Sequence, residues 1–357
     1  MASPSPKLFA KKISSWYTDH ERELPWRATN DPYKIWLSEI ILQQTRVAQG
    51  LPYYRDFARK YPTVQDLAAA SEREVLKTWE GLGYYSRARN LHACAKKVVK
   101  DFNGVFPDDY NDLLSLPGVG EYTAAAISSI AFGRSHAVVD GNVYRVLSRL
   151  FGLEDDISSG TGKKAFAALA AKLLDHEQPG IYNQALMEFG ALQCVPKSPN
   201  CTSCVLQRNC HAYQHKLQDV LPVKKRKVKV KRLFLTYLIF KEGSRLAMRK
   251  RGNDGIWRGL YDFYSIETSR YVKPDKLMKE DKALRDFEVV SISDPVVHVL
   301  THQKITARFV VLKGPAKGRL KTLFQEEGLR FLSPGAVAAR PKPVLISRFL
   351  TDSAILD

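Results

Sequence analysis

Hydrophobic positions in the first 216 residues follow the spacing of helices. Apolar side chains recur three or four residues apart at Val143, Val146, Leu147 and Leu150. This spacing is typical of the buried face of a helix. The same reasoning predicts helices over residues 34–48, 109–114, 121–132 and 161–190. The first part of the chain is therefore predicted to be all-α.

A strand-like pattern begins after a basic segment. An apolar run, a turn and a second apolar stretch predict a β-hairpin over residues 233–240, 242–244 and 246–251. Seven of the nine residues over 224–232 are Lys or Arg. Composition alone leaves open whether this run is a solvated linker, follows a DNA backbone or is a nuclear-import signal. Since 357 residues suffice for about two domains, we expect an all-α domain, a linker and an α+β domain over 1–216, 217–232 and 233–357.

The charge of the chain points to a polyanionic partner. The formal net charge is +18 at pH 7, and an excess of this size favours binding to nucleic acid. No apolar run approaches the roughly 20 residues that cross a bilayer. The first residues lack the apolar core of a signal peptide. We therefore expect an intracellular protein, cytoplasmic or in the nucleoid of a bacterium, or nuclear in a eukaryote.

A glycine-containing turn lies between two of the predicted helices. Residues 116–120 read Leu-Pro-Gly-Val-Gly, so Gly118, Val119 and Gly120 can form a tight turn whose backbone approaches another surface. The helix that follows begins with unpaired amide groups, which favour an anion such as a phosphate. Asp140 is expected at another helix start, where the dipole stabilises its carboxylate. The alternatives are an ordinary helical hairpin and a simple N-cap.

Four of the five cysteines lie within 17 residues. They are Cys194, Cys201, Cys204 and Cys210, with six, two and five residues between them. In an intracellular protein such a cluster favours a metal site over disulfides. Thiolates bind zinc and iron–sulfur clusters equally well. The four cysteines by themselves therefore leave open whether the site holds zinc or an iron–sulfur cluster. Cys94 is interpreted as a small buried hydrophobic residue.

Three segments together resemble the helix-hairpin-helix DNA glycosylases of the endonuclease III and MutY superfamily. The turn at 116–120 is followed by Val-Asp-Gly-Asn-Val at 139–143. Residues 36–45, Trp-Leu-Ser-Glu-Ile-Ile-Leu-Gln-Gln-Thr, resemble the segment that holds the catalytic glutamate. The cysteine spacing is similar to that of the family's iron–sulfur loop, so the resemblance implies a [4Fe-4S] cofactor held over residues 194–210.

The resemblance implies two catalytic carboxylates, Glu39 and Asp140, across one cleft. From sequence alone, the better interpretation places Glu39 on the polar face of its helix, with the carboxylate in solvent. The resemblance instead implies that Glu39 is buried among bulky apolar neighbours, which would raise its pKa and let it act as a general acid. Asp140 would remain an anion facing the positive charge that develops on the sugar. Tyr122 and Asn142 would orient this centre.

One position divides the superfamily. Relatives that nick the strand carry a lysine two places after the second hairpin glycine, where its amine forms a Schiff base. This chain has Tyr122 there, as the adenine-removing MutY branch does, so we expect a glycosylase with no strong lyase step. The resemblance also implies an adenine pocket lined by Arg22, Trp26, Arg27, Leu42, Gln184 and Met187.

The target base must leave the stacked duplex before it can be excised. The resemblance implies that Gln44 and Tyr84 lie beside the opposing base. We expect Thr45 and Leu82 to contact DNA with them, since residues 81–87 form an apolar and aromatic tip on a glycine turn. The alternative is a turn whose tyrosines pack inward.

The second domain resembles the MutY C-terminal module, which has a Nudix-like fold and reads 8-oxoguanine. Residues 255–263 are similar to the entry of a Nudix domain, but residues 273–287 lack the carboxylates that would hold Mg²⁺. Residues 298–302 align with the reading loop, which implies that Thr301 and His302 contact the lesion. The family often has an aromatic residue and a serine before the histidine, whereas this chain has Leu300 and Thr301. The hydroxyl is kept, and the hydrophobic wedge is weaker.

The resemblance therefore implies a monofunctional adenine DNA glycosylase, and we expect a monomer. Its expected substrate is double-stranded DNA with adenine opposite 8-oxoguanine or guanine. An endonuclease III-like enzyme that removes oxidised pyrimidines is the nearest enzymatic alternative. A non-catalytic, redox-sensing iron–sulfur DNA-binding protein is an alternative of a different class.

Overall fold

The computed structural model divides the chain into two compact units. It describes residues 4–225, 230–252, 255–280, 284, 287–313, 319–353 and 355–356. The helical unit consists of Met1–Ala69 and Asn90–Lys227, and the sheet unit consists of Ala70–Arg89 and Val228–Asp357. Residues 226–229 of the basic run lie outside the described residues, and the linker over 217–232 stays a prediction. Within the described residues, no helix is both long and apolar enough to cross a membrane.

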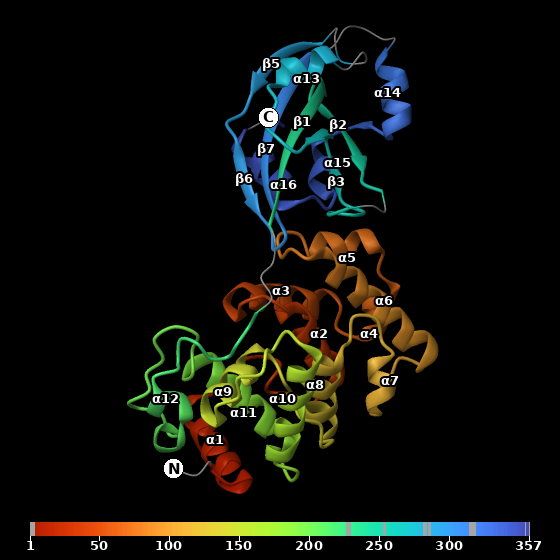
Figure 1. The fold of residues 1–357 in the computed structure, drawn as a ribbon. Coiled ribbons are helices and arrows are strands. Elements are labelled where there is room, and N and C mark those ends of the chain that lie inside the picture. Colours follow the sequence, from red (N-terminus) through yellow and green to blue (C-terminus); the bar gives the residue numbers. More distant parts are fainter. Residues whose placement is uncertain are drawn as a thin grey trace. The chain divides into compact units, whose positions relative to one another are not determined.

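The helical unit is built from short and medium-length helices joined by turns and by longer loops (Figure 1). Its helices are α1 (Pro6–His20), α2 (Pro32–Leu42), α3 (Val47–Lys60), α4 (Val64–Ala69), α7 (Tyr110–Leu114), α8 (Glu121–Phe132), α9 (Gly141–Phe151), α10 (Gly160–Leu173), α11 (Pro179–Leu192) and α12 (His211–His215), with a 3₁₀ turn at Gln207–Asn209. The helix α6 (Tyr85–Asp101) begins in the sheet unit and continues into the helical unit.

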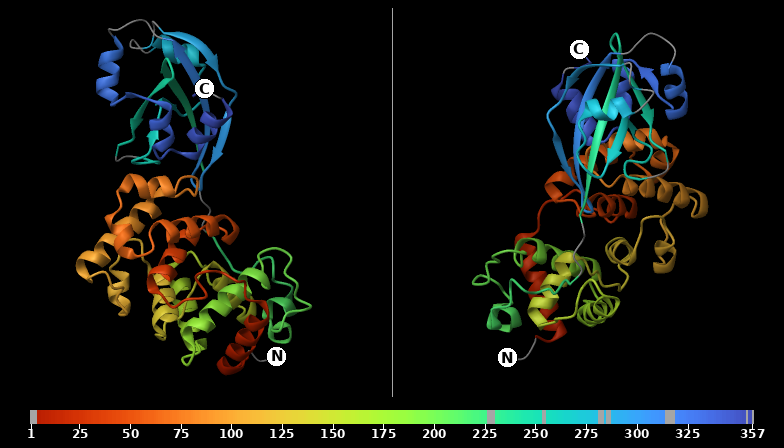
Figure 2. Two further views of the ribbon diagram at one scale, coloured as in Figure 1. Left: turned by 180° about the vertical axis from the view of Figure 1, so that it is seen from behind. Right: turned by 45° about the horizontal axis from the view of Figure 1, so that its top comes forward.

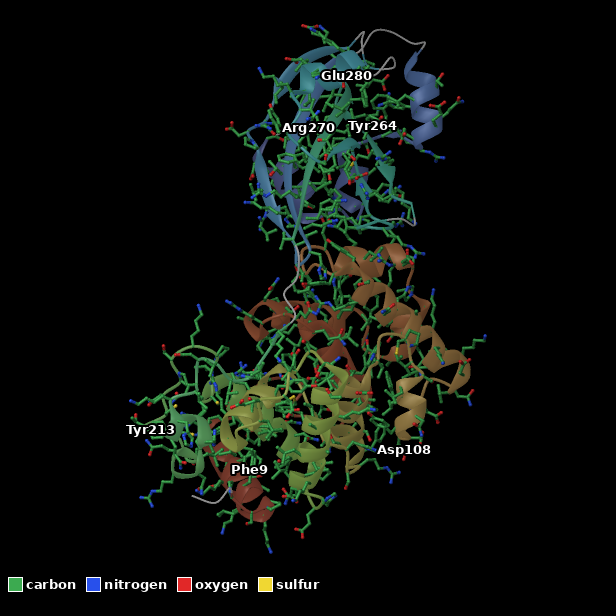
Figure 3. The ribbon with its side chains drawn as sticks, in the orientation of Figure 1. Phe9, Asp108, Tyr213, Tyr264, Arg270 and Glu280 are labelled. Atoms are coloured by element: carbon green, nitrogen blue, oxygen red, sulfur yellow. The ribbon has the colours of Figure 1, made fainter. Side chains whose placement is uncertain are left out.

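A hydrophobic core joins α1, α9, α10 and α11. Phe9 of α1, Val143 of α9 and Phe166 of α10 are completely buried in it, and Phe9 is labelled in Figure 3. Phe9 makes an edge contact with Tyr182 of α11, with ring centroids 6.3 Å apart. This packing fixes α9 and α11, the helices that contribute residues to the site described below.

The predicted helices around the glycine turn are confirmed, and two others are shorter than expected. Helices α8 and α9 have the predicted starts, and α8 ends at Gly133, whose φ of 64° lies in the left-handed region. The helix expected over 34–48 stops at Leu42, since Gln44 has φ 54° and interrupts the helical backbone. The helix expected over 161–190 is two helices, and Pro179 starts the second.

The sheet unit holds a mixed sheet with helices on both faces (Figure 2). Its strands are β1 (Lys231–Glu242), β2 (Arg245–Lys250), β3 (Tyr261–Asp262), β4 (Tyr264–Thr268), β5 (Glu288–Ile292), β6 (Val296–Val299), β7 (Gln303–Lys313) and β8 (Arg330–Leu332). Its helices are α5 (Glu72–Thr78), α13 (Pro274–Glu280), α14 (Arg319–Glu327), α15 (Pro334–Ala339) and α16 (Val344–Asp352).

The sheet is organised by the long central pair β1 and β7. These strands pair in parallel from Lys231 with Gln303 to Phe240 with Leu312. Alternate side chains then face opposite sides of the sheet. Val310 packs in a cluster with residues of α13 and α14, whereas Phe309 stacks on Phe349 of α16 with ring centroids 3.9 Å apart.

The predicted hairpin corresponds to β1 and β2, which pair antiparallel beside their turn. Several elements after residue 315 had no clear sequence signal, among them α14, β8, α15 and α16. Of the stretch 273–287, residues 281–283, 285 and 286 lie outside the described residues.

Candidate active site

A pocket with a volume of about 570 Å³ opens in the helical unit. It is lined by residues of α2, α8, α9 and α11 and of the loops that precede α2 and α3. Among the lining residues are Arg22, Trp26, Arg27, Glu39, Leu42, Gln44, Thr45, Tyr122, Asp140, Asn142, Gln184 and Met187. All four predicted catalytic residues and all six predicted adenine-pocket residues therefore border one cavity.

Glu39 is held in this pocket by α2 and by the phenol of α8. The Tyr122 hydroxyl donates a hydrogen bond of 2.5 Å to Oε2 of Glu39. Burial raises the pKa of Glu39 to about 7, helped by the nearby charge of Asp140 and opposed by the hydrogen bond from Tyr122. At neutral pH this carboxyl therefore holds a proton for a large part of the time, as a general acid requires. Burial also raises the pKa of Tyr122 well above its ordinary value, so the phenol stays neutral.

Asp140 caps the start of α9 and accepts three hydrogen bonds. They come from the backbone amides of Asn142 and Val143, at 2.9 and 2.7 Å, and from the Asn142 side-chain amide, at 2.8 Å. These bonds favour the anion. Burial nevertheless raises the pKa of Asp140 above its ordinary value. From the sequence, the helix dipole was expected to keep the Asp140 carboxylate ionised, but that expectation did not include the burial of this carboxylate, which opposes ionisation.

The close approach of α9 to α11 depends on a glycine. A Cβ on Gly190 would lie 2.6 Å from the Cβ of Asn142 and 2.9 Å from its carbonyl oxygen. Neither distance is compatible with normal packing, so any larger residue must displace the start of α9. Arg145 supports the same region, since it donates to Asn142 Oδ1 at 2.8 Å, to the Gly190 carbonyl at 2.6 Å and to the Cys194 carbonyl at 2.6 Å.

A buried carboxylate between two arginines was not predicted. Glu188 of α11 is 1% exposed and pairs with Arg22 at 2.6 Å and with Arg27 at 2.7 Å. Burial alone would raise its pKa, but the hydrogen bonds and charges of the two arginines hold the pKa of Glu188 at about 2. A glutamate inside the apolar stretch 185–192 carries the same signal as Glu39 and could have been found by the same reasoning. The cluster gives the pocket fixed hydrogen-bonding groups beside the apolar side chains of Trp26 and Met187.

The predicted phosphate-binding turn has the backbone that its glycines allow. Gly118 has φ 79°, and a Cβ there would lie 2.8 Å from the Cβ of Asn90. The amide of Val119 donates to the Leu116 carbonyl at 3.1 Å. Gly120 precedes α8 and provides no side-chain cap, so the first amides of α8 remain available to an anion.

The four clustered cysteines border a second, small cavity of about 30 Å³. Tyr213 of α12, labelled in Figure 3, also lines it. The buried Arg149 holds the surrounding loops, donating to the carbonyls of Val195, Pro196, Gln218 and Leu221. No three Cys, His, Asp or Glu side chains among the described residues are gathered closely enough to hold a metal ion. The cavity has thiols but no carboxylate or imidazole in its lining, and this donor set suits iron–sulfur clusters and zinc. Cys94 is fully buried elsewhere, as predicted.

The remaining predicted DNA contacts lie in the sheet unit. Tyr84 is 46% exposed, whereas Leu82 is 4% exposed and packs inside the unit. The Tyr84 hydroxyl and the Thr301 hydroxyl share a hydrogen bond. His302 is exposed, and its carbonyl accepts from the amide of Lys231 at 2.9 Å.

Comparisons with known proteins identify two family domains. Residues 37–173 match the HhH-GPD superfamily of base excision DNA repair proteins, and residues 235–352 match the NUDIX domain. A solved structure of a thermostable thymine-DNA glycosylase matches with a TM-score of 0.54 at 33% identity, covering 59% of this chain and 97% of that chain. A non-covalent endonuclease III–DNA complex matches with a TM-score of 0.51 at 25% identity, covering 59% of this chain and 96% of that chain.

Adenine DNA glycosylases are similar over a larger part of the chain. The human enzyme is 45% identical over 222 residues, covering 60% of this chain but only 41% of the human sequence. The chain therefore spans less than half the length of this mammalian relative. The enzyme of Buchnera aphidicola (subsp. Schizaphis graminum) is 33% identical over 276 residues, covering 77% of this chain and 79% of the relative. The chain belongs to the adenine DNA glycosylase family, with an HhH-GPD domain followed by a NUDIX domain.

Proposed function

We propose that this chain hydrolyses the N-glycosidic bond of adenine in double-stranded DNA. Its substrate is adenine opposite 8-oxoguanine or guanine. The observation that carries this proposal is the pair of carboxyl groups in one pocket: Glu39 with a pKa of about 7, and Asp140 held by three hydrogen bonds that favour its anion.

Glu39 acts first as the acid. It gives its proton to the adenine ring while the bond between the sugar and the base breaks and the bonding electrons leave with the base. The Asp140 carboxylate faces the sugar, where positive charge develops, and stabilises it. Water then adds to the sugar carbon and its proton returns to Glu39, which restores the enzyme. Tyr122 holds Glu39 by its hydrogen bond, and Asn142 holds Asp140.

The absence of strand nicking follows from the same pocket. A lyase step needs an amine that can form an imine with the sugar. The position in question holds Tyr122, whose neutral phenol is hydrogen-bonded to Glu39. We therefore assign a monofunctional glycosylase.

The pocket has the size and the groups to receive an extruded nucleobase. Its volume of about 570 Å³ exceeds that of one base. Trp26, Leu42 and Met187 supply apolar surface, and the cluster of Glu188 with Arg22 and Arg27 supplies fixed polar groups.

The four clustered cysteines are proposed to hold a [4Fe-4S] cluster. The similarity of their spacing to that of the family's iron–sulfur loop favours this cluster over zinc, and the thiols that line the shared cavity are compatible with either. When bound, the cluster would hold residues 194–210 in one conformation, which places the basic side chains of Lys197 and Arg208 on an ordered loop. The chemistry of base removal belongs to Glu39 and Asp140.

The NUDIX domain is proposed to read the base opposite the adenine. Thr301 and His302 lie between β6 and β7, and Tyr84 is hydrogen-bonded to Thr301. The hydroxyl of Thr301 supplies the hydrogen-bonding group expected of a reading loop. A monomer on double-stranded DNA is the proposed active form.

A base-release assay tests the function directly. The purified chain is mixed in excess with duplexes that carry adenine opposite each of the four bases and opposite 8-oxoguanine, and free adenine is measured over time. We expect release opposite 8-oxoguanine and guanine, with the strand left intact until alkali is added. A further duplex that carries an oxidised pyrimidine is incubated with borohydride, and base release with enzyme trapped on that duplex would indicate the endonuclease III-like alternative. Binding of duplex without release of any base would indicate a non-catalytic DNA-binding protein.

A further inference from the structure

Residues 70–89 belong to the sheet unit although the flanking sequence belongs to the helical unit. The segment contains α5, the turn over residues 79–84 and the first residues of α6. Its contacts with the C-terminal residues of the sheet unit are long-range in sequence, and they converge on the turn that carries Tyr84.

The turn itself has a well-defined conformation. Gly81, Gly83 and Tyr84 all have positive φ, at 98°, 79° and 48°. The Trp79 indole donates to the Gly83 carbonyl at 2.9 Å. The Arg87 guanidinium lies 5.1 Å from the Trp79 ring centroid and 5.4 Å from that of Tyr84. The left-handed conformation of Tyr84 is unfavourable for a residue with a side chain, so surrounding contacts must hold it.

Tyr85 connects this turn to the C-terminal part of the sheet unit. Its hydroxyl accepts from the amide of Gly81 at 3.2 Å and donates to the carbonyl of Lys342 at 3.0 Å. The side chain is 6% exposed. One buried hydroxyl thus closes the turn and fixes it to a residue 257 positions away in sequence.

Glu80 makes a second connection to the same region. Its carboxylate accepts a hydrogen bond from the Ser347 hydroxyl of α16 and pairs with Lys77. The Lys342 ammonium lies 3.9 Å from the same carboxylate and is held by the carbonyls of Val337 and Arg340, each at 2.7 Å. Lys342 is 4% exposed, so this connection is shielded from solvent.

We propose that Tyr85 and Glu80 are positioning residues that fix the turn over residues 79–84 to residues 342–347, so that Tyr84 and Thr301 form one element that reads the base opposite the adenine. This inference rests on the proposed function, because it assigns to these contacts the preference for 8-oxoguanine. Neither residue lines the adenine pocket. Their loss should therefore change the preference for the opposing base more than the rate of excision itself.

The sharpest variant is Tyr85→Phe, since it removes one oxygen and keeps the ring. Tyr237→Phe is the matched control: Tyr237 is also buried in the sheet unit, and its hydroxyl has no hydrogen-bond partner within the described residues. Glu80→Gln tests the second connection, with Glu242→Gln as its control, because Glu242 forms an exposed ion pair with Arg245 in the same unit.

The measurement is the single-turnover rate of adenine release opposite 8-oxoguanine divided by the rate opposite guanine. Since a net hydrogen bond changes an equilibrium about fivefold, we expect Tyr85→Phe and Glu80→Gln each to lower this ratio about three- to tenfold. The rate opposite guanine should change less than about twofold. The two control variants should keep the wild-type ratio and the wild-type melting temperature.

A double-variant comparison tests whether Tyr85 acts through the Tyr84–Thr301 pair. Thr301→Val should lower the ratio, and Tyr85→Phe should lower it no further in that background. If Thr301→Val and Tyr85→Phe lower the ratio independently, so that the double variant shows the product of the two factors, the proposal is wrong. An unchanged ratio in both Tyr85→Phe and Glu80→Gln would also overturn it. An equal fall of both rates would also overturn it, since that indicates a general loss of structure. If the wild-type protein itself shows no preference for 8-oxoguanine, the proposed substrate is wrong, and the roles proposed for Tyr85 and Glu80 are then wrong as well.

Discussion

The pocket of the helical unit and the turn over residues 79–84 of the sheet unit are held in different ways. In the pocket, Asp140 is fixed by the amides of the next few residues of its own helix. The turn is fixed by partners 257 and 267 residues away in sequence. Local motifs therefore carry much of the catalytic geometry, whereas the proposed reading element depends on the rest of the sheet unit.

Apart from substitution of a catalytic carboxyl group itself, the largest effect is expected where two helices of the pocket touch. Gly190→Ala would place a methyl group 2.6 Å from the Cβ of Asn142, which must shift the residue that holds Asp140. Since small displacements of catalytic groups cost about 100-fold in rate, we expect single-turnover adenine release to fall by about that factor. The free energy of unfolding should fall by about 1–3 kcal/mol, as for other overpacked sites.

Gly160→Ala is the matched control for this change. Gly160 starts α10, and a Cβ there would meet no heavy atom within 4 Å. We expect a rate within about twofold of the wild-type value and an unfolding free energy within about 0.5 kcal/mol of it. If Gly190→Ala behaves like this control, the close approach of α9 and α11 has no catalytic importance.

The second-largest effect is expected in the pH dependence of adenine release. Glu39 must be protonated to act, and its pKa is about 7. The single-turnover rate should therefore fall about tenfold per pH unit above pH 7. At the acid end the rate should fall as well, because burial raises the pKa of Asp140 and its carboxylate then takes up a proton. A pH–rate profile with a plateau extending beyond pH 9 would contradict the role of Glu39 as the acid.

The same pKa has a consequence for stability. The folded-state pKa lies above the ordinary value of 4.5, so the folded state binds this proton more tightly than the unfolded chain. The resulting stabilisation is present below pH 4.5 and is lost as the pH rises through 7. Relative to Glu39→Gln, the wild-type protein should lose about 1–3 kcal/mol of unfolding free energy between pH 5 and pH 8. Denaturant unfolding at both pH values measures the difference.

The smallest effect is expected in the sheet unit. Thr301→Val removes one hydroxyl that is bonded to Tyr84 and leaves the adenine pocket untouched. We expect release opposite 8-oxoguanine to slow about fivefold, the size of one net hydrogen bond, and release opposite guanine to remain unchanged. If Thr301→Val slows adenine release equally opposite 8-oxoguanine and opposite guanine, the sheet unit does not act separately from the pocket in choosing the opposing base.

One part of the pocket, the helix start at Asp140, could be predicted from local sequence patterns, and most of the other pocket residues were implied only by the family resemblance. Asp140 precedes Gly141 and a run of helical apolar positions, so both its place at a helix start and its hydrogen bonds were expected. Sequence alone favoured a solvent-facing Glu39, and its burial with a raised pKa was implied only by the resemblance to the helix-hairpin-helix glycosylases.

Other features could not be predicted because they depend on tertiary contacts. Gly190 is required by the approach of Asn142 from another helix, which no local pattern indicates. The contact of Tyr85 with Lys342 joins segments whose pairing has no sequence motif. The break at Gln44 was missed because its left-handed backbone occurs in a non-glycine residue within an apolar helical pattern.

The central claim is that Glu39 and Asp140 act on the same bond, and one set of rates tests it most directly. Single-turnover adenine release opposite 8-oxoguanine is compared among the wild-type protein, Glu39→Gln and Asp140→Asn, with duplex affinity measured in parallel and Glu242→Gln as the control. The account predicts that both pocket variants bind the duplex and release adenine at least about 100-fold more slowly, the range of general acid catalysis. A wild-type rate in either pocket variant would contradict it.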